Sequence, residues 1–297
     1  MKEDTALTLK RMVDNGEAKS EKKATDMLNQ SDLIGKLLTT PKRKPDTFVG
    51  VRAYEWRLLE LSEIPFIGKL TQVREWVDLL VEKTFIGDSF SLTGNQDGVL
   101  ACHNAMITTL LLKIAPQKKE HIDAGIRWIL EYQNIERRLD CAWEGKDLYT
   151  KYGGCMKSVP CFYGVVKSMV ALTEYKKLFG LSDLLEVKLQ GGLDYILKHK
   201  LYQRLSSKEP IEPSIIQNFY PYPYKTNLIE LLTLMKDNNL LDHENCQEAI
   251  DLLRTKQRSD GFWQADVFFM KSAWVPFDSP GKKGEWITHV VKSLGLQ

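Results

Sequence analysis

Cysteine, net charge and long apolar runs are all scarce in this chain of 297 residues. The five cysteines are odd in number and unevenly spaced, which excludes a simple disulfide framework and favours a reducing compartment. A formal net charge of +2 gives no field that would attract nucleic acid, so we expect no nucleic-acid partner. No stretch of about 18 uncharged apolar residues occurs, so no membrane span is expected. The charged start, residues 1–4, lacks the apolar segment of a secretory signal, and we expect a cytoplasmic protein.

What is present is the composition of a globular protein, with 43% hydrophobic and 27% charged residues. Aromatic residues make up 10% of the chain and include seven tryptophans. This content suits a large core or an aromatic-lined cavity. No alternating strand pattern of consequence is found, so the fold class is predicted to be all-α.

The most informative stretch is Gln257–Trp263, which reads Q-x-x-D-G-x-W directly after an apolar-periodic segment. Asp-Gly favours a tight turn, because glycine adopts positive φ without penalty. The tryptophan is then predicted to fold back as an apolar plug, and the Gln257 amide to bond the backbone at a neighbouring helix end. Taken alone, this pattern also fits a helix end beside a core tryptophan.

Two series of helical segments alternate along the chain, which indicates repeated helical hairpins. One series is centred on Trp76, Trp128, Tyr195 and Leu252. The other begins near Cys102, Cys161, Tyr224 and Trp286. Both recur at roughly 50 to 70 residues. Residues 165–168 (VVKS) return as residues 290–293 at the same place in their unit.

The domain boundary is expected near residue 48. Residues 1–48 are predicted to form a cap of two short helices and a linker containing Pro41 and Pro45. Residues 49–297 are predicted to form the repeat domain, beginning with an amphipathic helix over 49–62. Terminal units of repeat arrays are usually atypical, which agrees with the different character of the first segment.

Repeated hairpins closed by Q-x-x-D-G-x-W resemble the terpenoid cyclase and protein prenyltransferase superfamily. The match is clearest over residues 70–297, and most specific at Gln257–Trp263 and residues 286–288. The blocks at 155–167 and 274–276 look like uncharacterised prokaryotic proteins with prenyltransferase and squalene-oxidase repeats. The resemblance implies an α/α toroid, and a small apolar or isoprenoid-like ligand in its centre.

The catalytic signatures of that superfamily are absent from this sequence. It contains neither the acidic D-x-D-D cluster nor the metal-binding D-D-x-x-D motif. The Asp-x-Cys pair of the prenyltransferase zinc site is also missing, since Asp140 and Cys141 are adjacent. The resemblance therefore predicts architecture and leaves the reaction, if there is one, unassigned.

Four residues are candidates for chemistry. Cys102 and His103 are expected at the start of a helix, where the helix dipole lowers a thiol pKa. A small buried cysteine beside a capping histidine is the alternative. Asp140 and Glu144 lie in an enlarged loop, where paired carboxylates could serve as acid and base, or could simply be solvated.

Ligand contacts are predicted from aromatic and cysteine side chains that could line a cavity. These residues are Trp143, Tyr152, Cys155, Cys161, Tyr163, Tyr222 and Tyr224. The same aromatic side chains could instead pack loops onto the scaffold. Cys141, Cys155 and Cys161 lack the close spacing of zinc ligands, so a zinc site is not expected and no cofactor is assigned.

Three functions remain open at this point. The first is a toroid that binds, and in one version transforms, a small apolar or isoprenoid-like ligand. The second is a non-enzymatic helical-repeat scaffold for a protein partner, which the missing catalytic signatures favour. The third is a carbohydrate-active α/α toroid, which would need a pair of carboxylates facing one cleft.

Overall fold

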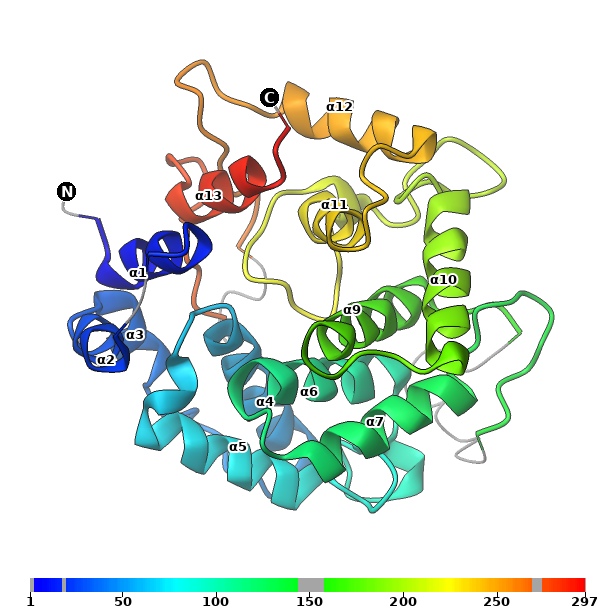
Figure 1. Ribbon diagram of the computed structural model, residues 1–297, viewed down its shortest axis with the longest axis horizontal. Helices are drawn as coiled ribbons and strands as arrows, with labels where there is room; N and C mark the ends of the chain where they lie inside the picture. Colours follow the sequence, from blue (N-terminus) through cyan, green and yellow to red (C-terminus); the bar gives the residue numbers. More distant parts are fainter. Residues whose placement is uncertain (1–2, 18–19, 144–157, 269–273, 297) are drawn as a thin grey trace.

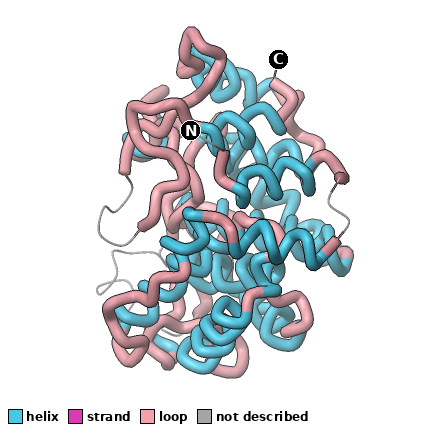
Figure 2. The backbone as a smooth tube through the Cα atoms, turned by 90° about the vertical axis from the view of Figure 1, so that its left-hand side faces the viewer, coloured by secondary structure: helices cyan, strands magenta, loops and turns pink. Residues whose placement is uncertain are grey.

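The computed structural model describes residues 3–17, 20–143, 158–268 and 274–296. Within these ranges the protein is all-helical, and its only extended pairings are isolated bridges such as Trp263 with Gly284 (Figure 2). The helices are α1 (Thr5–Asp14), α2 (Glu21–Asn29), α3 (Asp32–Leu37), α4 (Phe48–Ser62), α5 (Thr71–Thr84), α6 (Ala101–Ile114), α7 (Lys119–Tyr132), α9 (Phe162–Phe179), α10 (Asp183–Lys198), α11 (Leu228–Asp237), α12 (Gln247–Thr255) and α13 (Glu285–Ser293). Short 3-10 turns lie at Ile67–Lys69, Gln96–Gly98, Pro213–Ile216 and Glu244–Cys246.

The helices alternate between two positions along the chain, as in a helical-repeat protein (Figure 1). One series, α4, α6, α9 and α11, packs successively helix against helix toward the middle of the molecule. The other series, α5, α7, α10 and α12, lies outside, each helix packed on a member of the first. We call these the inner and the outer helices. The residues at which the predicted segments were centred, Trp76, Trp128, Tyr195 and Leu252, all belong to outer helices.

The last helix lies beside the first. Figure 1 shows α13 next to α1, and His289 Nε2 lies 2.7 Å from Asp14 Oδ2 across that contact. One hydrophobic core runs from Ala6 in α1 to Leu294 just after α13. The N-terminal helices therefore share the core of the hairpins that follow them.

The N-terminal segment contains three helices, not the two that the sequence predicts. Ser31 divides the second run, because its hydroxyl accepts a hydrogen bond from the Ile34 N–H and caps the start of α3. Asp4 caps α1 in the same way and also accepts from the Leu33 N–H at 3.1 Å. That second bond ties the start of α1 to the start of α3.

The helix over 49–62 is present as α4, but it is buried on most of its circumference instead of one face. Glu55 and Glu60 are both fully buried beside leucine and tryptophan side chains. This helix lies between α5 on one side and α6 on the other, so little of it meets solvent.

The turn at Gln257–Trp263 folds back as predicted, with one difference. Gly261 has φ of 78°, and Trp263 is buried, with its indole N–H donating to Leu253 O in the last turn of α12 at 2.8 Å. The Gln257 amide, however, donates to Gly261 O inside the same turn and not to a neighbouring helix. The link to the next unit comes from the Trp263 N–H, which donates to Thr288 Oγ1 of α13 at 2.9 Å.

Candidate functional site

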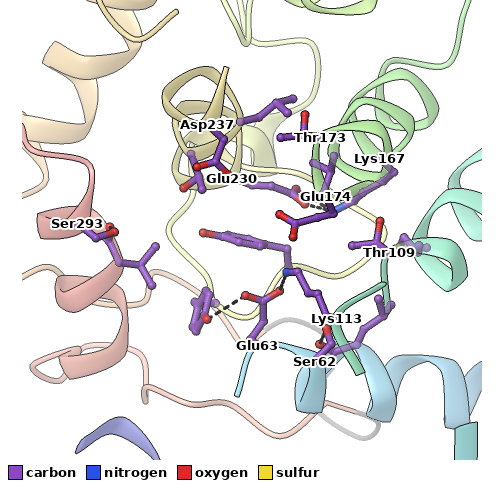
Figure 3. Close-up of a pocket in the computed structure, with 18 of the residues that line it drawn as sticks. Ser62, Glu63, Thr109, Lys113, Lys167, Thr173, Glu174, Glu230, Asp237 and Ser293 are labelled. Carbon is purple, nitrogen blue, oxygen red and sulfur yellow. Dashed lines mark hydrogen bonds and ion pairs between the residues drawn. The ribbon is translucent and has the colours of Figure 1, made fainter. Parts of the chain in front are cut away.

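A cavity of about 160 Å³ lies among the inner helices (Figure 3). Its wall combines α1, α4, α6, α9, α11 and α13 with the loop before α11. In the described part of the chain, the outer helices contribute no lining side chain. The lining residues are Lys10, Asp14, Leu59, Ser62, Glu63, Met106, Thr109, Lys113, Lys167, Val170, Thr173, Glu174, Tyr220, Tyr222, Glu230, Thr233, Leu234, Asp237, Val290 and Ser293.

Helical periodicity explains why these side chains meet. On each inner helix the lining positions recur every three or four residues, which places them on one face. The stripes are Met106, Thr109 and Lys113 on α6, Lys167, Val170, Thr173 and Glu174 on α9, and Glu230, Thr233, Leu234 and Asp237 on α11. Unlike the rest of the inner-helix surface, these stripes are largely polar.

Lys113 and Glu63 form an ion pair on the cavity wall, 2.7 Å apart. The Tyr220 hydroxyl also donates to Glu63, at 3.1 Å (Figure 3). Burial alone would raise the pKa of Glu63, but the Lys113 ammonium outweighs it and the pKa lies below its usual value. Burial likewise opposes the effect of Glu63 on Lys113, whose pKa is nevertheless raised. Both groups therefore stay charged at neutral pH.

A second pair, Lys167 and Glu230, bridges α9 and α11. The Lys167 ammonium lies 2.6 and 2.7 Å from the two Glu230 oxygens (Figure 3). Both side chains are almost completely buried. Burial lowers the pKa of Lys167, and the neighbouring Glu230 carboxylate opposes that shift.

At the end of α1, Asp14 accepts from two side chains, Lys10 and His289. Lys10 lies 2.7 Å from Asp14 within α1, and His289 of α13 lies at the same distance. Burial opposes the shift, but the hydrogen bonds from His289 and Lys10 lower the pKa of Asp14. Asp14 and Lys10 line the cavity, so the contact between the first and last helices is part of its wall.

The remaining cavity carboxylates are Glu174 on α9 and Asp237 on α11. Both are contacted by Lys177, at 2.7 and 2.9 Å. Lys177 itself is not among the lining residues and its side chain is 45% exposed. Tyr220 and Tyr222, with ring centres 5.2 Å apart, complete the aromatic part of the wall.

Cys102 and His103 do begin a helix, α6, but they do not line this cavity. Burial, with Cys161 and Glu55 close by, raises the pKa of Cys102, so the expected lowering by the helix dipole is outweighed. His103 Nδ1 lies 2.7 and 2.8 Å from the two oxygens of buried Glu55. Cys102 is therefore a buried thiol that burial keeps protonated, and His103 is held by a carboxylate in the core.

The acidic loop lies elsewhere. Asp140 and Cys141 border a surface hollow at the end of α7. Trp143 is buried against Trp128 and Tyr132, and its indole N–H donates to Gln96 O at 3.3 Å. Trp143 thus packs the loop onto the scaffold. The predicted site residues Glu144, Tyr152 and Cys155 lie outside the described residues.

Of the predicted ligand contacts, Tyr222 reaches the central cavity. Tyr163 instead donates its hydroxyl to Glu212 at 2.9 Å. Cys161 is the residue before α9, and Tyr224 is half-buried against the core. Neither Cys161 nor Tyr224 lines the cavity.

Within the described ranges, no group of three or more histidine, cysteine, aspartate or glutamate side chains is placed to hold a metal ion. Nor does any described helix combine the length and apolar character needed to cross a membrane. No protein-family model, curated protein or solved structure matches this chain. The site is therefore interpreted from its own chemistry.

Proposed function

We propose that this protein is an α/α toroid whose central cavity binds a small polar molecule. The toroid is supported by the alternation of inner and outer helices and by the contact of α13 with α1. The observation that carries the binding proposal is the shared wall: six helices far apart in the sequence each turn one stripe toward the same cavity. In four of them the stripe includes charged side chains.

The chemistry of the wall favours a polar ligand over an isoprenoid one. A hydrocarbon in this cavity would remove water from carboxylate and ammonium groups without replacing their hydrogen bonds, which is costly. Hydroxyl groups from Thr109, Thr173 and Thr233 add further hydrogen-bonding positions. At about 160 Å³ the cavity is also smaller than the roughly 300–1,000 Å³ typical of sites for drug-sized ligands.

Binding is better supported than acid catalysis. Glu63 is held ionised by Lys113, which lowers its pKa, so it can accept hydrogen bonds but has no proton to donate. Glu230 is held by Lys167 through both of its oxygens. These contacts position the carboxylates as fixed acceptors for a ligand.

A thermal-shift screen with a plugged variant tests the proposal. The probes are size-matched polyols, amines and carboxylic acids, with a prenyl diphosphate as the apolar competitor. A ligand that binds only the folded protein raises stability by about 2.7 kcal/mol at a concentration of 100 Kd. Thr233→Phe fills the cavity from α11 and should abolish the shift.

Thr255→Phe is the matched control. Thr255 is exposed on outer helix α12 and, like Thr233, donates its hydroxyl to a carbonyl of its own helix. This control should keep the shift. A polar probe whose shift survives Thr233→Phe, or a screen in which only the prenyl diphosphate acts, would overturn the proposal.

A further inference from the structure

The cavity wall carries more negative than positive charge. Five carboxylates and three ammonium groups line it, an excess of two negative charges. Three of the carboxylates, Asp14, Glu63 and Glu230, are paired with the three lining lysines. Glu174 and Asp237 have no partner in the wall itself, and they face the cavity from α9 and α11 (Figure 3).

Helix dipoles add to this negative potential, because several helices end at the cavity. Asp14, Ser62, Asp237 and Ser293 are each the last residue of a helix, in α1, α4, α11 and α13. All four line the cavity. Lys113 is the penultimate residue of α6. A helix C-terminus carries roughly half a negative charge and attracts cations. Several such ends directed at one space favour a cation there over an anion.

An ammonium group already occupies the position between the two unmatched carboxylates. Lys177 Nζ lies 2.7 Å from Glu174 Oε1 and 2.9 Å from Asp237 Oδ2. The two carboxylates are therefore spaced to bind one primary ammonium together. A second lysine behaves similarly, since Lys236 Nζ donates to Ser293 O at the end of α13. Lining residues of α9, α11 and α13 thus already bind two lysine ammonium groups.

The ammonium group of Lys177 is bound only weakly at this position. Its side chain is 45% exposed, and ion pairs of this kind contribute little because water competes for both charges. Its four-carbon stem is flexible and can move into solvent. A ligand ammonium that entered from the cavity would meet the same two carboxylates, in a cavity that Tyr220 and Tyr222 also line.

We propose that the ligand of the central cavity carries a primary ammonium group, which displaces Lys177 from between Glu174 and Asp237. Lys177 then acts as a built-in competitor that fills the position in the empty protein. This inference rests on the proposed function and adds the class of ligand to it. It assigns the recognition of charge to Glu174 and Asp237, while the Lys113–Glu63 and Lys167–Glu230 pairs form the fixed wall.

Calorimetric titration with simple probes tests it, at constant ionic strength because salt screens such contacts. The probes are n-butylammonium, 1,4-diaminobutane, n-butanol and butyrate. We expect the ammonium probes to bind more tightly than n-butanol and butyrate not to bind. Lys177→Met should raise the association constant for the ammonium probes about three- to tenfold, and Glu174→Gln should lower it about tenfold or more.

Lys176→Met is the matched control. Lys176 lies on the same helix with the same 45% exposure, but it pairs with Glu186 of α10 away from the cavity. It should leave the association constants unchanged. Equal effects of the two lysine variants, or n-butanol binding as tightly as n-butylammonium, would overturn the inference.

The outcome also separates this inference from the proposed function. If n-butanol or a polyol binds, and Thr233→Phe abolishes that binding, the central cavity is a binding site but the ammonium inference fails. If no probe of any charge binds to a protein that circular dichroism shows to be folded, both fail. Tighter ammonium binding in Lys177→Met, lost again in Thr233→Phe, supports both.

Discussion

Four charged residues on the inner helices are buried in places where leucine or valine would be expected. Glu55, Glu60, Lys167 and Glu230 are each at most 5% exposed. Glu55 bonds His103, Lys167 and Glu230 bond each other, and Glu60 accepts from the Val275 N–H with Arg57 beside it. A buried charge is tolerated when such partners are in place. These contacts therefore fix the inner helices relative to one another.

Breaking the Lys167–Glu230 pair should be strongly destabilising. Lys167→Met leaves the Glu230 carboxylate buried without its partner, and we expect the free energy of unfolding to fall by about 3–5 kcal/mol. The double variant Lys167→Met/Glu230→Gln should recover part of that loss, because no unpaired charge remains. Urea denaturation followed by circular dichroism measures both. The single variants Lys167→Met and Glu230→Gln complete the comparison. If their losses of unfolding free energy add up to the loss of the double variant, the two side chains do not interact.

Glu60 should make stability depend on pH. Burial raises its pKa from 4.5 to about 8, although Arg57 and the Val275 N–H oppose the shift. The folded protein therefore keeps a proton on Glu60 over a range where the unfolded chain has lost it. The contribution of Glu60 to the free energy of unfolding is fully present below the pKa that Glu60 has in the unfolded chain. It is lost as the pH rises from that value through the folded pKa of about 8, by at most about 1.4 kcal/mol per pH unit.

The variant Glu60→Gln cannot lose a proton, so this part of the pH dependence should disappear. The free energy of unfolding of Glu60→Gln, measured relative to that of the natural protein, should therefore rise from pH 5 to pH 8. Urea midpoints measured at several pH values give the comparison. Parallel profiles for the two proteins would show that Glu60 does not titrate in this range.

The buried charges were not among the candidates that the sequence predicted. A usable signal was present. Glu60, Lys167 and Glu230 each stand within an apolar stretch, at 58–61, 165–169 and 228–232. A single charge in such a stretch is expensive to bury alone, so it indicates a partner on another helix. The sequence could not show which helix supplies that partner.

At the scale of single elements, the turn at Gln257–Trp263 links outer helix α12 to the last helix, α13. It does so through Trp263, which bonds Leu253 O on one side and Thr288 on the other. Gly261 makes the reversal possible with its φ of 78°. An added Cβ at Gly261 would meet nothing within 4 Å, so any cost of substitution comes from the backbone alone.

Gly261→Ala should therefore destabilise the protein by about 1–2 kcal/mol, the cost of left-handed backbone for a residue with a side chain. Gly35→Ala is the control, since Gly35 lies within α3 and its added Cβ also meets open space. There the same change should be stabilising by about 0.5–1 kcal/mol, because glycine is a poor helix former. Thermal unfolding compares the two. Effects of the same sign would contradict the assigned role of Gly261.

Elements were more predictable than contacts. The helices centred on Trp76, Trp128 and Tyr195 could be predicted from apolar residues at helical spacing. The helix that contains Trp128 ends at Tyr132, directly before Gln133. Ser31 was overlooked as a helix start because it lies in a short polar stretch, residues 29–32, between two apolar runs. Which face of α6 or α9 turns to the cavity could not be predicted, because these helices bury nearly their whole first turns.

At the scale of the whole molecule, the contact of α1 with α13 joins residues 275 positions apart in the sequence. We expect His289→Gln to weaken this contact by about 1 kcal/mol or less, because the pair is partly exposed. Burial would raise the pKa of Asp14, but the hydrogen bonds from His289 and Lys10 outweigh it and lower the pKa. The contacts of Asp14 therefore stabilise the folded protein above the pKa that Asp14 has in the unfolded chain. This stabilisation is lost as the pH falls through the lower pKa that Asp14 has in the folded protein.

Hydrogen exchange measures the weakening of this contact separately in each helix. In His289→Gln, amide protection should fall in α1 and α13 and stay unchanged in α7, which lies outside the contact. Protection that falls uniformly in all helices would show that the contact has no local role, and that the substitution acts on the fold as a whole.

The order and alternation of the helices could be inferred from the sequence, because a repeat leaves its period in the chain. The chemistry of the centre could not. The aromatic and cysteine candidates pointed to an apolar cavity, whereas the structure brings together lysines and carboxylates whose spacing in the sequence, such as the 50 residues between Glu63 and Lys113, carries no signal. Only the three-dimensional arrangement shows that they share one wall.

The most direct measurement is a crystal structure of the protein purified without added ligand and then soaked with n-butylammonium. We expect density for the probe in the central cavity, with its nitrogen between Glu174 and Asp237 and with Lys177 turned toward solvent. A cavity holding only ordered water after soaking, with Lys177 still bonded to both carboxylates, would contradict it.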